Sequence, residues 1–174
     1  MTKQQEREPV DLVLRVITNM KNMIKKIGLV LTVICITVLL TGCESKSKLS
    51  PDKFVDKMNE KGFEITNVMN RYRGNDDINN AVVAIKSNYK IEYFQFIDNE
   101  KASYFYENKK SAFSNYDYGT SNKSEVNINN YNKYDLTVNG RYRLISRIDN
   151  TVIYLDVEEM YKQDVSSIIE ELGY

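Results

Sequence analysis

The sequence predicts an α+β fold in which helices pack on one face of an antiparallel sheet, in the order αβββ-αβββ-α. Three observations lead to this prediction. Turn dipeptides at Asn139-Gly140 and Asp149-Asn150 separate three alternating strands. Segments whose apolar residues recur with the spacing of an amphipathic helix occur before, between and after the predicted strands. Hairpin plus helix over residues 81–113 is similar to hairpin plus helix over residues 142–172, which suggests a ββα pseudo-repeat.

The first helix is expected over residues 51–61. Ser50 is a good N-cap, and Pro51 suits the first helical position. Phe54 and Met58 are one turn apart and form a buried stripe, and Gly62 ends the helix.

The middle of the chain is expected to contain a strand, a hairpin and a second helix. The strand covers residues 63–71, and the hairpin strands cover 81–85 and 90–97 with a turn at Ser87-Asn88. Asp98 or Asn99 caps the helix, whose apolar positions continue to Phe113. Residues 114–130 show no clear period, and a connection of this length without secondary structure is either functional or mobile.

The last third gives the clearest pattern. Strands are expected over residues 131–138, 141–148 and 151–157, followed by an amphipathic helix over 158–172 that Gly173 stops.

A two-residue turn at Asp149-Asn150 also sets the register of the last hairpin. It places Arg143 opposite Asp156 and Arg141 opposite Glu158, as cross-strand ion pairs on a solvated face. Leu136 reaches the core face only if the preceding hairpin turn carries a one-residue bulge.

An apolar run of 14 residues, Ile27 to Leu40, follows Lys25 and Lys26. This length is typical of a signal-peptide core and is short of the about 20 residues that span a bilayer, although anchoring by a transmembrane helix is the alternative. The run ends in Leu40-Thr41-Gly42-Cys43, which resembles the lipobox of bacterial lipoproteins. The resemblance implies that Cys43 receives a lipid and becomes the mature N-terminus.

Residues 20–48 as a whole resemble the signal regions of small, uncharacterised cell-surface lipoproteins of low-GC Gram-positive bacteria. Residues 1–42 are therefore expected to be an N-terminal extension plus signal peptide, with a true start at Met20 or Met23. Residues 43–49 form the lipidated cysteine and a polar tether, and residues 50–174 form one globular domain. The resemblance places this domain on the extracytoplasmic side of the cell membrane.

Composition limits the chemistry. Histidine is absent, and the two cysteines, Cys35 and Cys43, both precede the expected domain, so no catalytic residue, metal site or cofactor is predicted. Six of 24 basic and three of 24 acidic residues precede Glu44, which leaves 18 basic and 21 acidic residues and a net charge of −3. This charge gives no reason to expect nucleic-acid binding.

The sequence therefore favours a non-enzymatic binding or interaction module. An inhibitor or accessory subunit of an envelope enzyme or transporter is the alternative, and a carboxylate-based hydrolase is a more remote one. The candidate interaction surface consists of tyrosines in or beside the polar stretch, namely Tyr116, Tyr118, Tyr131 and Tyr134. Exposed tyrosines suit contact with an envelope protein, peptide or glycan, whereas tyrosines that only fill the sheet would have no such role.

Overall fold

The computed structural model describes residue 20 and residues 45–174. Apart from Met20, the predicted signal peptide, the lipobox-like sequence and Cys43 lie outside the described residues. The chain divides into two compact units, 1–44 and 45–174, and the second unit is the domain described below.

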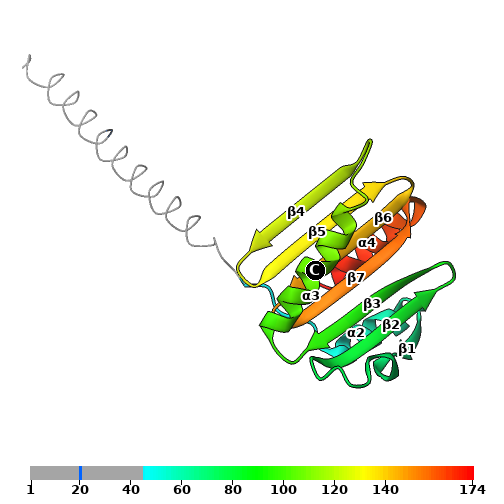
Figure 1. Cartoon of the computed structure of the whole chain (residues 1–174), viewed down its shortest axis with the longest axis vertical. Helices are drawn as coiled ribbons and strands as arrows, with labels where there is room; N and C mark the ends of the chain where they lie inside the picture. Colours follow the sequence, from blue (N-terminus) through cyan, green and yellow to red (C-terminus); the bar gives the residue numbers. More distant parts are fainter. Residues whose placement is uncertain (1–19, 21–44) are drawn as a thin grey trace, which may run out of the picture. The chain divides into compact units, whose positions relative to one another are not determined.

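The domain contains one seven-stranded antiparallel sheet in the order β1-β2-β3-β7-β6-β5-β4 (Figure 1). Its strands are β1 (Glu64–Asn67), β2 (Ile78–Lys86), β3 (Tyr89–Phe96), β4 (Asn122–Ile128), β5 (Tyr131–Val138), β6 (Arg141–Ile148) and β7 (Thr151–Glu158). The α-helices of the domain are α2 (Pro51–Glu60), α3 (Asn99–Ser114) and α4 (Lys162–Glu171), and two 3-10 helices are η1 (Met69–Tyr72) and η2 (Glu159–Tyr161). The predicted α+β class and antiparallel sheet are confirmed.

The observed order of elements differs from the predicted one by an additional strand. Residues 114–130, expected to be a polar loop, contain β4, which pairs with β5 along its whole length. The order is therefore αβββ-αββββ-α. The strand predicted over 63–71 is shorter and ends at Asn67, because η1 follows it.

Helices cover both faces of the sheet, so the prediction that they pack on one face is wrong. α2 and α4 pack on one face, in a core that includes Phe54, Leu144 and Ile169. α3 packs on the other face with Phe94 and Ile145, and Figure 1 shows it in front of the sheet. The central strands are thus buried on both sides.

The ββα pseudo-repeat is not confirmed. β3 and β7 are antiparallel neighbours, so a rotation exchanging the two hairpins would have its axis perpendicular to the sheet. Such a rotation keeps each helix on its own face, whereas α3 and α4 lie on opposite faces.

Two cores also explain the position of Leu136. β5 and β6 pair without a bulge, and Leu136 is opposite Arg143 on the α3 face, where it is fully buried. A bulge would be needed only if all core residues lay on one face of the sheet.

The turns of the sheet lie at its two ends, called the entry end and the far end. The entry end holds the β4–β5 turn (Asn129-Asn130) and the β6–β7 turn (Asp149-Asn150). The far end holds the β2–β3 turn (Ser87-Asn88) and the β5–β6 turn (Asn139-Gly140).

Candidate functional site

The chain enters the domain along the entry end of the sheet, in close contact with its turns. The backbone N–H of Lys46 donates to Oδ1 of Asn130 (3.1 Å), and Nδ2 of Asn130 donates to the Lys46 carbonyl (2.8 Å). Nζ of Lys48 donates to Oδ1 of Asn150 (2.8 Å). The buried hydroxyl of Tyr93 donates to the Leu49 carbonyl (2.7 Å). Residues 46–49, expected to belong to a flexible tether, are therefore attached to the domain.

The Lys46 side chain strengthens this attachment. Its ammonium lies 3.9 Å from the ring centroid of Tyr131 and donates to the Gly173 carbonyl (2.9 Å). Burial lowers the pKa of Lys46, and nearby Lys133 lowers it further, while Glu170 acts in the opposite direction. Lys46 thus covers Tyr131, which is only 8% exposed.

The four tyrosines of the predicted surface do not come together. Tyr131 and Tyr134 are buried in different cores on opposite faces of the sheet. Tyr116 and Tyr118 are 45% and 60% exposed and lie in the connection from α3 to β4, which reaches the sheet at its far end. The exposed part of the predicted surface is therefore this pair.

Tyr116 covers an ion-pair cluster on the α3 face. Nε of Arg143 donates to Oδ2 of Asp156 (3.2 Å), and Oδ1 of Asp156 accepts from Nε (2.9 Å) and Nη2 (2.7 Å) of Arg141. The Tyr116 ring centroid lies 4.3 Å from the Arg143 guanidinium. The predicted register, with Arg143 opposite Asp156 and Arg141 opposite Glu158, is confirmed.

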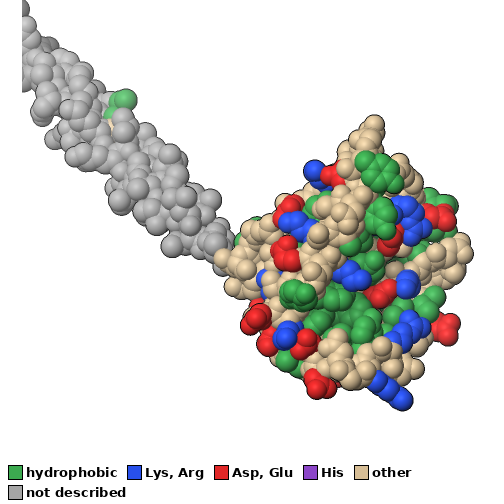
Figure 2. Space-filling model, viewed as in Figure 1, with side chains coloured by type: hydrophobic (Ala, Val, Ile, Leu, Met, Phe, Trp, Pro, Cys, Tyr) green, Lys and Arg blue, Asp and Glu red, His purple; other side chains and the backbone are tan. Residues whose placement is uncertain are grey.

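The environment of Arg143 differs from the predicted solvated face. Arg143 is only 8% exposed, because α3 and the segment after it cover this side of the sheet. Its Nη1 is buried without a hydrogen-bond partner among the described residues. The cluster is consequently a structural ion-pair group in which Arg143 is buried and Arg141 and Asp156 are partly exposed, beside an exposed tyrosine. Elsewhere on the α3 face, acidic and basic side chains are interspersed (Figure 2).

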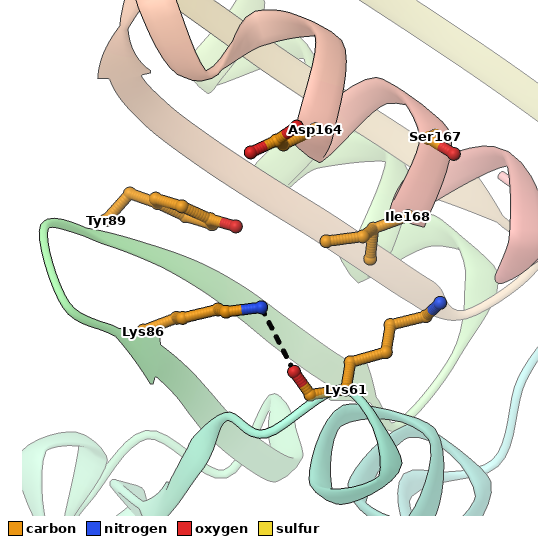
Figure 3. A pocket seen from close by; sticks show the side chains of 6 residues that line it. All are labelled: Lys61, Lys86, Tyr89, Asp164, Ser167 and Ile168. Carbon is orange, nitrogen blue, oxygen red and sulfur yellow. Dashed lines mark hydrogen bonds between the residues drawn. The ribbon is translucent and has the colours of Figure 1, made fainter.

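A second feature at the far end is an open cleft of about 360 Å³ between α4, the end of α2 and the β2–β3 hairpin (Figure 3). It is lined by Lys61, Lys86, Tyr89, Asp164, Ser167 and Ile168. Nζ of Lys86 donates to the Lys61 carbonyl (3.1 Å), and Lys61 forms an ion pair with Glu171.

Tyr89 forms one wall of the cleft. Its ring packs edge-on against Phe63, with ring centroids 5.8 Å apart, and lies tilted against Tyr161, with ring centroids 5.0 Å apart. Burial and the carboxylate of Asp164 raise the pKa of Tyr89, so its hydroxyl stays protonated at neutral pH. The cleft thus offers ammonium groups, one carboxylate, hydroxyl groups and one aliphatic side chain.

These groups can bind a polar ligand through hydrogen bonds and charge pairing. The cleft contains one carboxylate, whereas glycoside hydrolysis ordinarily uses two. Within the described residues, no group of three or more acidic or cysteine side chains is arranged to hold a metal ion. Lys86, Tyr89 and Asp164 come from separate elements and form no local motif, so no sequence pattern points to them.

Comparisons of the chain with protein-family models, curated proteins and solved structures found no significant match. Among the described residues, no helix combines the length and hydrophobicity needed to cross a bilayer.

Proposed function

We propose that the protein is an extracytoplasmic lipoprotein, anchored to the cell membrane through Cys43, and that its domain is a non-enzymatic binding module for an envelope protein, peptide or glycan. The observation that carries the proposal is the boundary of the domain. The compact unit begins at Ser45, two residues after the cysteine of the lipobox-like sequence. A signal peptide removed before Cys43 would leave the folded unit intact.

The far end of the sheet supports the binding role. It carries the polar cleft beside Tyr89 and the exposed pair Tyr116 and Tyr118, whereas the chain enters at the opposite end. Aromatic rings beside hydroxyl and charged groups suit the mixed apolar and polar surfaces of peptides and sugars.

The anchor is tested by metabolic labelling of the full chain with radioactive palmitate in a bacterial host. Wild-type protein should carry label and fractionate with membranes, and Cys43→Ser should do neither. Cys35→Ser is the matched control, because it removes the other thiol, and it should leave labelling unchanged. Undiminished label in Cys43→Ser would overturn the lipid attachment.

The binding role is tested with soluble peptidoglycan fragments, which contain both glycan and peptide, by ligand-detected NMR. We expect saturation transfer to the fragments with wild-type protein and a clear loss with Lys86→Gln. Lys90→Gln is the control, since Lys90 is in the same hairpin but outside the cleft, where it pairs with Glu92 (2.7 Å). Equal transfer with both variants would exclude the cleft as the site for these fragments.

A further inference from the structure

The distance between the expected anchor and the first fixed residue is short. Lys46 is three residues after Cys43, and three extended residues span at most about 10 Å. Each polar headgroup layer of a bilayer is roughly 5–8 Å thick. Because Asn130 holds the Lys46 backbone through two hydrogen bonds, a lipid on Cys43 brings the β4–β5 turn to the headgroup layer.

An exposed aliphatic side chain lies at this corner. Ile128 is the last residue of β4, is 52% exposed, and pairs with Tyr131 across the turn. The ammonium of Lys46 lies over the ring of Tyr131, on the same side of the sheet as Ile128. An apolar side chain beside an amine is the combination that favours the bilayer interface, because the first enters the acyl boundary while the second remains with anionic headgroups.

The corner differs from the rest of the entry end. Ile97 is also exposed there, but it follows β3, four strand positions from β4, and it lies beside Asp77 and Asp98. At about 4.8 Å per strand, this separation is roughly 19 Å. Asp149 and Glu170 lie near the Ile128 corner as well, but there the Lys46 ammonium accompanies the exposed aliphatic side chain, and this pairing of an apolar group with a cation fits an anionic membrane surface.

We propose that the domain rests on the bilayer at the β4–β5 corner, with the Ile128 side chain in the lipid interface and Lys46 at the headgroups. This inference rests on the proposed lipid anchor at Cys43. It adds that residues 46–49 hold the domain in one orientation relative to the membrane. A flexible tether would instead let the domain rotate freely.

The absence of tryptophan in the chain makes a direct test available. Ile128→Trp and Met160→Trp each introduce a single tryptophan at an exposed site, the second in η2 after the far-end terminus of β7. The lipidated full chain is reconstituted in vesicles of phosphatidylcholine and phosphatidylglycerol, with or without bromine on the acyl chains. We expect bromine to quench Ile128→Trp by about twofold, since interfacial side chains enter 5–10 Å, and to leave Met160→Trp unchanged.

A third variant tests the attachment itself. Asn130→Ala removes both hydrogen bonds to the Lys46 backbone, so quenching in the Ile128→Trp background should fall toward the Met160→Trp value. Urea midpoints of all variants verify that they are folded.

The outcomes separate the two proposals. If the chain floats with the vesicles but Ile128→Trp is quenched no more than Met160→Trp, the orientation is overturned and the anchor stands. Failure of the wild-type chain to float would overturn the anchor and the orientation together.

Discussion

Replacing Asp156 by Asn should destabilise the domain because it removes the only acidic partner that the buried Arg143 has among the described residues. Arg143 is 8% exposed and donates to Asp156, whose side chain is 31% exposed and also binds Arg141. Breaking a buried ion pair costs about 3–5 kcal/mol, and we reduce this to about 2 kcal/mol because water reaches Asp156. The half-exposed bridge to Arg141 adds about 0.5 kcal/mol. The expected loss in free energy of unfolding is therefore about 2.5 kcal/mol.

Equilibrium unfolding in urea, followed by circular dichroism, measures this loss. For an m-value of about 2 kcal/mol/M, the midpoint should fall by roughly 1.2 M. Glu158→Gln is the matched control, because Glu158 is opposite Arg141 in the ladder but forms no salt bridge within the described part of the chain. Its midpoint should change by less than about 0.3 M, as for an ordinary surface substitution.

A double-mutant cycle identifies Arg143 as the cause. In an Arg143→Met background Asp156 no longer has a buried cationic partner, so Asp156→Asn should cost only the about 0.5 kcal/mol of the Arg141 bridge. A loss of 2 kcal/mol or more that persists in this background would refute the reasoning, as would equal effects of Asp156→Asn and Glu158→Gln.

Four further substitutions test other polar groups and one turn. Tyr93→Phe should lower the free energy of unfolding by about 1–2 kcal/mol and speed hydrogen exchange near Leu49, because it removes the hydrogen bond to that carbonyl. Tyr106→Phe should cost nothing in the same assay, since the buried Tyr106 hydroxyl has no partner in the described residues, and equal losses would contradict this. Gly140→Ala should cost about 1 kcal/mol in urea unfolding because φ is +70° at this position, and a neutral result would exclude strain there. Burial raises the pKa of Asp135. The contribution of the protonated Asp135 to stability is therefore present below the unfolded pKa and is lost as pH rises through the folded pKa. Asp135→Asn should consequently raise the urea midpoint at pH 7 and not at pH 3.

The sequence was sufficient where local interactions determine the structure. The turn at Asn139-Gly140 requires positive φ at both residues, and Asn and Gly accept it most readily. The three strands around this turn and the next were therefore predicted within a residue of their observed ends. Ser50 and Asp98 cap α2 and α3 through side-chain hydrogen bonds, as expected for their residue types.

β4 could not be predicted from its own residues. It lies at the sheet edge, is largely exposed on both faces, and so has no apolar alternation. Its strand conformation comes from pairing with β5, and ion pairs from Lys123 to Asp117 and from Glu125 to Lys110 fix it to the α3 side. Periodicity analysis does not detect contacts of this kind.

The two-sided burial of the sheet was missed for a related reason. A strand that is covered on both faces has a nearly continuous apolar sequence. Such a sequence lacks the alternation that would show which residues point to each face of the sheet. Arg143 also favoured the wrong prediction of a solvated face, because an arginine within a strand is ordinarily exposed to solvent. Among the candidate site residues, Tyr131 and Tyr134 were misleading because tyrosine composition does not distinguish a buried ring from an exposed one.

The attachment of residues 46–49 changes what the proposed anchor would do. A free tether of seven residues would have an r.m.s. length of about 15 Å and would let the domain face in any direction. With Lys46 held by Asn130, an anchor at Cys43 would leave the sheet to set the distance from the bilayer to the cleft. β3 runs for eight residues from Tyr89 at the far end to Phe96 at the entry end, which at about 3.3 Å per residue gives at most roughly 25 Å. Under the proposed orientation, a partner bound in the cleft is therefore confined to a narrow layer above the membrane, and membrane attachment itself becomes a source of specificity.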